Sequence, residues 1–120
     1  MHKILVINND LDTMSLIKDL LEKHDHNFEV KVTGTREKVP GIIKDFNPDL
    51  VIIDVLQKDA LNILKTSAPN IPIILMTGET LRDRNVELGV NDVIEKPFVF
   101  DLLESKIRKH VGANPSLSAE

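Results

Sequence analysis

The chain of 120 residues contains no cysteine, and its apolar residues form no long run. The lack of cysteine excludes disulfides, a thiol nucleophile and a thiolate metal site. It also suits a reducing compartment, and we expect a cytoplasmic protein. The longest aliphatic runs, ILVI and LVII, are too short for a membrane span or for the core of a signal peptide.

The chain also lacks an excess of basic residues. Lys and Arg number 15 against 19 Asp and Glu, so the formal net charge is -4, and no dense basic block is present. We therefore expect no direct binding to nucleic acid or to an anionic membrane surface. The length fits one domain over residues 1–111, and the small and polar segment 112–120 is expected to be a tail or linker.

Apolar runs alternate with helix-period segments five times. The expected strands are Ile4–Ile7, Phe28–Val32, Leu50–Ile53, Ile71–Met76 and Asp92–Glu95. The first expected helical face is Met14, Ile17, Leu20 and Leu21, after an N-cap at Asp12. The second is Val39, Ile42, Ile43 and Phe46, and Pro40 delays or kinks the start of that helix. The third has Leu61 and Leu64, the fourth runs from Leu81 to Leu88 and is closed by Gly89, and the fifth has Val99, Leu102, Leu103 and Ile107. This alternation predicts a parallel sheet with helices on both faces.

The composition of the strands predicts their order in the sheet. ILVI, LVII and IPIILM are apolar throughout, as is typical of central parallel strands. FEVKV alternates apolar and charged residues, as a half-exposed edge strand does, and DVIE is brief. We therefore predict an α/β fold of the doubly wound, flavodoxin-like kind, with five strands in the order 2-1-3-4-5 and five helices. In such sheets ligands bind at the carboxyl ends of the strands.

Polar residues follow four of these strands where the strands end. They are Asn8, Asn9 and Asp10 after the first strand, Asp54 after the third, Thr77 after the fourth and Lys96 after the fifth. A carboxylate in such a group can act as a nucleophile and form an acyl phosphate. A hydroxyl and an ammonium group can hold the phosphoryl oxygens. The sequence therefore predicts a site that binds or accepts a phosphoryl group.

The segments ILVINNDLD, PDLVIID, IPIILMTG and NDVIEKPF, in this order and spacing, resemble the receiver domain of bacterial two-component response regulators. The resemblance extends over Lys3 to Val111. It implies that Asp54 is the phosphoacceptor, that Thr77 and Lys96 contact the phosphoryl group, and that the Lys96–Pro97 peptide bond is cis. It also implies a role in phosphorelay signalling, with a histidine kinase or phosphotransfer protein as the partner. The domain is then no enzyme beyond self-phosphorylation and self-dephosphorylation at Asp54.

Several positions depart from the family pattern. Asn8 and Asn9 stand where the family has the acidic pair that holds magnesium, and Val93 stands at the position of an aromatic switch residue. The segments after Asp54 and after Thr77 are shorter than usual. Asp54 and Lys96 then nearly cancel in charge, so we expect them to pair. Mg²⁺ binding should be weak or lost, with Asn9, Asp54 and Asp10 offering the remaining oxygen ligands.

Two other functions remain open. A pseudo-receiver would bind partners without phosphorylation, at the face formed by the fourth helix, the fifth strand and the fifth helix, with Phe98 or Phe100 taking part if exposed. Alternatively, DLDT matches the start of haloacid-dehalogenase-like phosphatases, with Asp10 as the nucleophile and Asp12 as the general acid. Asn8 and Asn9, which separate Asp10 from the strand, weigh against this phosphatase. A flavin or nucleotide carrier is disfavoured because no Gly/Ser/Thr-rich loop follows the first strand.

Overall fold

A computed structural model describes residues 2–24, 27–54, 59–78 and 90–111 of the chain. The strands are β1 (His2–Ile7), β2 (Phe28–Thr33), β3 (Leu50–Asp54), β4 (Ile73–Thr77) and β5 (Asp92–Glu95). The helices are α1 (Leu11–His24), the 3-10 helix η1 (Arg36–Lys38), α2 (Val39–Phe46), α3 (Asp59–Ser67) and α5 (Phe100–Val111). The helix expected over 81–88 and the tail expected over 112–120 lie outside the described residues.

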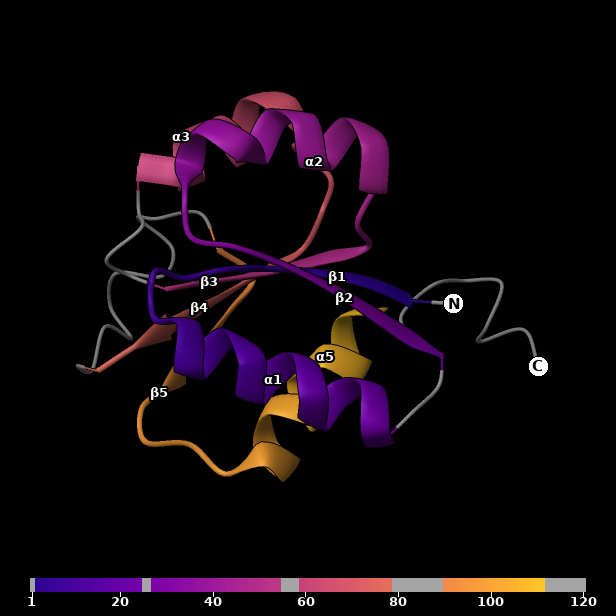
Figure 1. Cartoon of the computed structure of the whole chain (residues 1–120), viewed down its shortest axis with the longest axis vertical. Coiled ribbons are helices and arrows are strands. Elements are labelled where there is room, and N and C mark those ends of the chain that lie inside the picture. The colour runs from indigo at the N-terminus through magenta and orange to yellow at the C-terminus, as the bar shows by residue number, and fades with distance from the viewer. Residues whose placement is uncertain (1, 25–26, 55–58, 79–89, 112–120) are drawn as a thin grey trace.

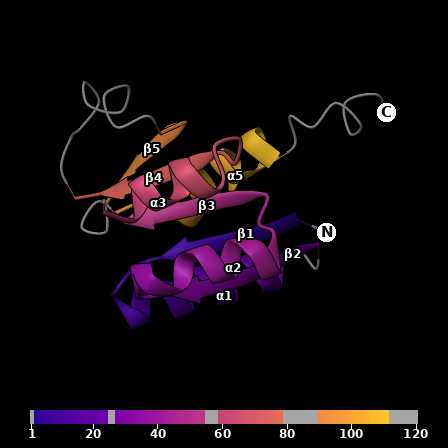
Figure 2. The same ribbon diagram turned by 90° about the horizontal axis from the view of Figure 1, so that it is seen from above.

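The five strands form one parallel sheet in the order β2-β1-β3-β4-β5, which confirms the predicted fold. Helices α1 and α5 cover one face of the sheet, and α2 and α3 cover the other (Figures 1 and 2). The central strands β3 and β4 are buried at every residue, whereas β2 at the edge alternates between buried and exposed residues. No helix in the described ranges combines the length and the apolar composition that a membrane span requires.

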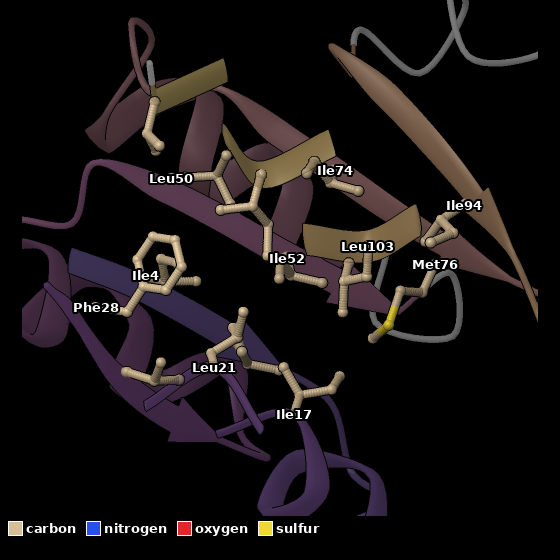
Figure 3. Close-up of a cluster of buried hydrophobic side chains, with 14 of the residues drawn as sticks. Ile4, Ile17, Leu21, Phe28, Leu50, Ile52, Ile74, Met76, Ile94 and Leu103 are labelled. Carbon is tan, nitrogen blue, oxygen red and sulfur yellow. The ribbon is translucent and has the colours of Figure 1, made fainter. Parts of the chain in front are cut away.

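Alternation along the strands divides the apolar side chains between two cores, because successive side chains of a strand point to opposite faces. Ile4 and Val6 of β1 belong to the core under α1 and α5, which we call the α1/α5 core. Leu5 and Ile7 belong to the core under α2 and α3, the α2/α3 core. Figure 3 shows part of the α1/α5 core, where side chains of α1 and α5 meet those of the strands.

Local signals mark the start of α1 and both ends of α2. Helix α1 begins at Leu11 because the Asp10 carboxylate accepts hydrogen bonds from the N–H groups of Asp12 and Thr13. The expected N-cap at Asp12 is therefore wrong by two residues. Helix α2 begins with Pro40 in its first turn, where no donor is required, and it ends before Asn47, which adopts a left-handed φ of 53°.

The face that α5 buries differs from the predicted one. Leu103, Ile107 and Val111 point into the α1/α5 core, whereas Val99 precedes the helix and is exposed, as is Leu102. A repeat of four residues from Leu103 sets the buried face, so the neighbouring Leu102 lies at its margin. The phenylalanines Phe98 and Phe100 are partly buried against this core, as expected of packing residues.

Candidate functional site

Asn8 and Asp54 are neighbours at the carboxyl edge of the sheet. In the parallel register Ile7 of β1 pairs with Ile53 of β3, so the next residue on each strand is Asn8 and Asp54 respectively. The Asn8 N–H continues the pairing with β2, because it donates to the carbonyl oxygen of Thr33 at 3.0 Å. Alternation then places both side chains on the face of the α1/α5 core. Neighbouring strands lie about 4.8 Å apart, so the two groups are within reach of a shared ligand.

Lys96 reaches back from the end of β5 to Asp54. Its ammonium group forms an ion pair and hydrogen bond with Asp54 Oδ2, which confirms the predicted pairing. The Asp54 side chain is only 2% exposed, whereas that of Lys96 is 36% exposed. A buried carboxylate requires such a partner because removing it from water is costly. The Lys96–Pro97 peptide bond is cis, as expected.

Thr77 lies beside this ion pair along the sheet. It is the last residue of β4, it is fully buried, and it follows Met76, which pairs in register with Asp54. Its carbonyl oxygen accepts a hydrogen bond from the Lys96 N–H at 2.7 Å. The structure therefore brings Asp54, Thr77 and Lys96 to one edge, as their places in the sequence predicted.

The Asn8 side chain is almost entirely buried, with 1% of the residue exposed. Its Oδ1 accepts a hydrogen bond from the Asp10 N–H at 2.8 Å, which closes a tight turn after β1. None of the described residues supplies a hydrogen-bond partner for its Nδ2, although this atom is buried. Asn8 thus presents a buried donor beside Asp54.

The Asp10 carboxylate is engaged at the start of α1. Its Oδ2 accepts the Thr13 hydroxyl at 2.9 Å, and its Oδ1 accepts the N–H groups of Asp12 and Thr13 at 3.1 and 3.4 Å. The hydrogen bonds from Thr13, followed by the weaker influences of Asp12 and Lys96, hold the pKa of Asp10 below its ordinary value. In this structure the Asp10 carboxylate is therefore the cap of α1, and its expected part in holding a metal stays a prediction. Asn9, which lies between Asn8 and Asp10 in the sequence, is exposed.

These contacts do not fit a carboxylate cage for magnesium. Mg²⁺ requires six oxygen ligands in near-octahedral geometry and favours carboxylates. Asn8 and Asn9 are neutral, the Asp10 carboxylate caps α1, and Asp54 Oδ2 is paired with Lys96. In the part of the chain that the structure describes, no three His, Cys, Asp or Glu side chains gather in a way that could hold a metal ion.

A groove of about 500 Å³ runs between β5 and the start of α5. It is lined by Val93, Ile94, Glu95, Pro97, Phe98, Val99, Leu102 and Lys106. Val93, expected from the resemblance to stand at the aromatic switch position, is partly buried against the α2/α3 core. Val99 and Leu102 are 68% and 47% exposed, so these residues, rather than Phe98 or Phe100, offer apolar surface.

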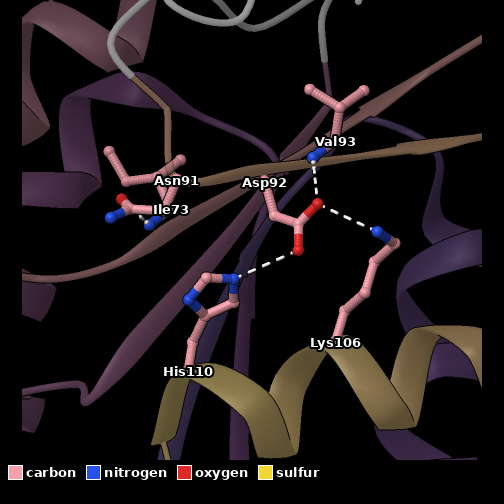
Figure 4. A network of polar contacts seen from close by, with 6 residues as sticks. All are labelled: Ile73, Asn91, Asp92, Val93, Lys106 and His110. Carbon is pink, nitrogen blue, oxygen red and sulfur yellow. Dashed lines mark hydrogen bonds and ion pairs between the residues drawn. The ribbon is translucent and has the colours of Figure 1, made fainter. Parts of the chain in front are cut away.

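Sequence reasoning missed a second carboxylate centre, at the opposite edge of the sheet. Asp92 at the start of β5 contacts Lys106 Nζ at 2.9 Å and His110 Nε2 at 3.1 Å, and it accepts the Val93 N–H at 2.9 Å (Figure 4). Lys106 and His110 lie in the second half of α5, where basic side chains also suit the negative end of the helix dipole. Their spacing of four residues, which places them on one face of α5, is the signal in the sequence that this reasoning did not use.

Comparison with known proteins gives one consistent family. Residues 4–108 match the family described as Response regulator receiver domain. The transcriptional regulatory protein CpxR of Escherichia coli is 33% identical over 115 residues, which cover 90% of this chain and 48% of the relative. The sensory transduction protein BceR of Halalkalibacterium halodurans is 35% identical over 115 residues, covering 90% of this chain and 49% of the relative. This chain therefore spans about half the length of these curated relatives.

The solved structures support the same fold. A two-component response regulator from Clostridium difficile superposes with a TM-score of 0.84 at 20% identity, covering 96% of this chain and 99% of that chain. The BeF3-activated receiver domain of Klebsiella pneumoniae RstA gives a TM-score of 0.80 at 24% identity, covering 92% of this chain and 98% of that chain.

Proposed function

The chain belongs to the family of response regulator receiver domains, and on this premise we propose that Asp54 accepts a phosphoryl group from a histidine kinase or phosphotransfer protein. The observation that carries the proposal is the buried Asp54 carboxylate at the end of a central strand, paired with Lys96. A signalling domain that receives phosphate on a side chain is not otherwise a catalyst. A cytoplasmic location fits such a partner.

The residues at this edge have complementary tasks in the proposed transfer. An Asp54 oxygen attacks the phosphorus, since an ionised carboxylate is a competent nucleophile. The Lys96 ammonium, which now neutralises Asp54, moves to the phosphoryl oxygens, where the negative charge has shifted. Thr77 follows Met76, the register neighbour of Asp54, and its hydroxyl is proposed to donate a further hydrogen bond to the same group.

The neutral Asn8 and Asn9 lead us to propose a weakened dependence on magnesium. When bound, the ion would neutralise phosphoryl charge, and Asn9 and Asp54 are the oxygen donors that remain for it. Each carboxylate that is absent removes a short-range attraction for the cation. Phosphorylation should therefore depend less on the concentration of Mg²⁺ than a pocket with three carboxylates would require.

A second candidate is a pseudo-receiver, which binds partners without being phosphorylated. It is favoured by the two asparagines and by Val93, because a β-branched side chain has few rotamers with which to report the state of Asp54. The groove beside β5, with Val99 and Leu102 exposed, offers such a partner an apolar surface. The phosphatase reading with Asp10 is disfavoured by the family and by the use of that carboxylate as a helix cap.

The deciding experiment is incubation of the full chain with acetyl phosphate, followed by intact-protein mass spectrometry with and without Mg²⁺. The phosphoacceptor function predicts one added phosphoryl group, which is absent in Asp54→Ala. If no condition yields an acyl phosphate, including incubation with candidate histidine kinases, the pseudo-receiver is the better description.

A further inference from the structure

The buried Nδ2 of Asn8 should lower the stability of the fold, because this donor has no partner among the described residues. A buried donor without a partner costs about 1–3 kcal/mol, because the water that it loses is not replaced. The other end of the same amide is satisfied, since Oδ1 accepts the Asp10 N–H at 2.8 Å. The turn after β1 therefore needs only the oxygen of Asn8. A buried Asp or Asn oxygen would serve it equally, and the NH₂ group remains to be accounted for.

The neighbours of Asn8 in the sheet show from which side a partner can come. On the side of β2 the register places Gly34 opposite Asn8, and glycine has no side chain. A Cβ built on Gly34 would be in van der Waals contact with the Asn8 carbonyl oxygen, at 3.4 Å, and would bring no hydrogen-bonding group to the Asn8 side chain. On the other side, in β3, the register neighbour is Asp54. A group attached to Asp54 is thus the partner that the sheet brings closest to the Asn8 side chain.

Replacing a carboxylate with an amide also reverses the preference of this position. A carboxylate only accepts hydrogen bonds and attracts cations, whereas an amide NH₂ donates two hydrogen bonds. The charged partners around Asp54 point the same way, because its Oδ2 already faces the Lys96 ammonium. An amide donor and an ammonium group on two sides of Asp54 are suited to the oxygens of an added anion.

We infer that Asn8 Nδ2 donates a hydrogen bond to the phosphoryl group carried by Asp54, so that the domain accepts this group without a divalent cation. The inference rests on the proposed function and adds a phosphoryl-binding residue to it. With acetyl phosphate, an Asp54 oxygen forms the new bond to phosphorus while the bond from phosphorus to the acetate oxygen breaks. Acetate leaves with that electron pair, and no proton, oxidant or further reactant is needed.

The first test compares phosphorylation in excess EDTA with that in Mg²⁺, using acetyl phosphate and intact-protein mass spectrometry. We expect the native chain to phosphorylate at rates that differ by less than about threefold between the two conditions, a barrier difference below about 0.7 kcal/mol. Asn8→Asp retains the oxygen that accepts the Asp10 N–H and removes both donors. We expect this variant to be at least tenfold slower in EDTA. Asn70→Asp, the same change at an exposed residue before β4, is the control and should match the native rate.

The second test reads the hydrogen bond directly and does not depend on a variant that folds. In ¹H–¹⁵N spectra of the native chain in EDTA, the side-chain NH₂ signals of Asn8 should shift when acetyl phosphate is added. The NH₂ signals of Asn70 should stay in place. Loss of the shifting pair in Asn8→Asp would assign it.

The outcomes separate this inference from the function on which it rests. If the native chain is phosphorylated only with Mg²⁺, or if Asn8→Asp matches it in EDTA, the inference fails and Asp54 remains the phosphoacceptor. An unmoved Asn8 signal in the phosphorylated protein also overturns the inference. If no acyl phosphate forms in either condition, both the inference and the proposed phosphoacceptor function fail.

Discussion

Two carboxylates, one at each edge of the sheet, solve the problem of burial in different ways. Asp92 at the amino edge is enclosed by contacts from three other residues, namely Lys106 and His110 of α5 and the N–H of Val93 (Figure 4). Asp54 at the carboxyl edge is more deeply buried, at 2% against 16% side-chain exposure, and pairs with Lys96, whose own side chain remains partly exposed. Both carboxylates therefore have a lysine partner.

The contacts of Asp92 indicate that the amino edge of the sheet contributes to stability. Lys106 and His110 extend from one face of α5 and attach that helix to the first residue of β5. Burial raises the pKa of Asp92, but the hydrogen bonds from Lys106, His110 and Val93 outweigh it, so the pKa lies below its ordinary value of 3.8. At the other edge Asp54 pairs with a partly exposed lysine, and the neighbouring strand carries a buried amide donor, Asn8. That edge resembles a site prepared for a ligand.

The largest expected effect is on phosphorylation, when the carboxylates are substituted one at a time. Asp54→Ala should abolish formation of the acyl phosphate, because it removes the nucleophile. Asp92→Asn should still be phosphorylated, since it lies at the far edge. Asp10→Asn should also be phosphorylated, because asparagine is a good N-cap and keeps α1 in place. Mass spectrometry of the three variants after exposure to acetyl phosphate makes the comparison, and a phosphate that depends on Asp10 would revive the phosphatase reading.

The contacts of Asp92 should instead contribute to the stability of the domain. Asp92→Asn should lower the free energy of unfolding by about 2 kcal/mol at neutral pH, because it weakens charge-assisted hydrogen bonds in a partly buried site. Since the pKa of Asp92 is lowered, its contribution is complete above 3.8 and is lost as the pH falls through the folded-state value. Urea titrations should therefore show the native and variant curves converging in acid. The exposed Asp19→Asn is the control, and a gap that stays constant with pH would contradict this account.

Magnesium affinity should respond to the carboxyl edge alone. Asn8→Asp combined with Asn9→Asp should bind Mg²⁺ at least tenfold more tightly than the native chain, which is about 1.4 kcal/mol. The physical reason is the restored negative charge beside Asp54. Isothermal calorimetry would measure both affinities, and crystals of the native chain grown without a large excess of Mg²⁺ should show no ordered cation. A tight site in the native chain would reveal a ligand other than those described.

The smallest expected effect concerns communication from Asp54 to the groove beside β5. Val93 is β-branched and has few rotamers, so if it holds the switch position, as we propose, a partner bound there should distinguish poorly between the two states of Asp54. Its affinities for the native, phosphorylated and Asp54→Ala proteins should agree within tenfold. Titrations of such a partner would measure this, and a difference of tenfold or more, about 1.4 kcal/mol, would establish a coupling route through other residues.

The amino-acid sequence by itself determined the five strands and their order. Burial leaves a local record, because a strand covered on both faces is apolar throughout and an edge strand alternates. The same local record placed Asp54, Thr77 and Lys96 at one edge, because parallel strands end together. The resemblance to receiver domains supplied the cis bond before Pro97, which the structure confirmed.

Only the tertiary structure decided which groups meet. Asp10 rather than Asp12 caps α1, since both acids suit the position and the path of the chain selects one. Lys106 and His110 meet Asp92 only after α5 has packed against β5. The burial of the Asn8 NH₂ group, and its place next to the strand that carries Asp54, follow from the pairing of β1 with β3. A pattern along the chain records how deeply a residue is buried, whereas a hydrogen bond between distant segments depends on their relative positions in space.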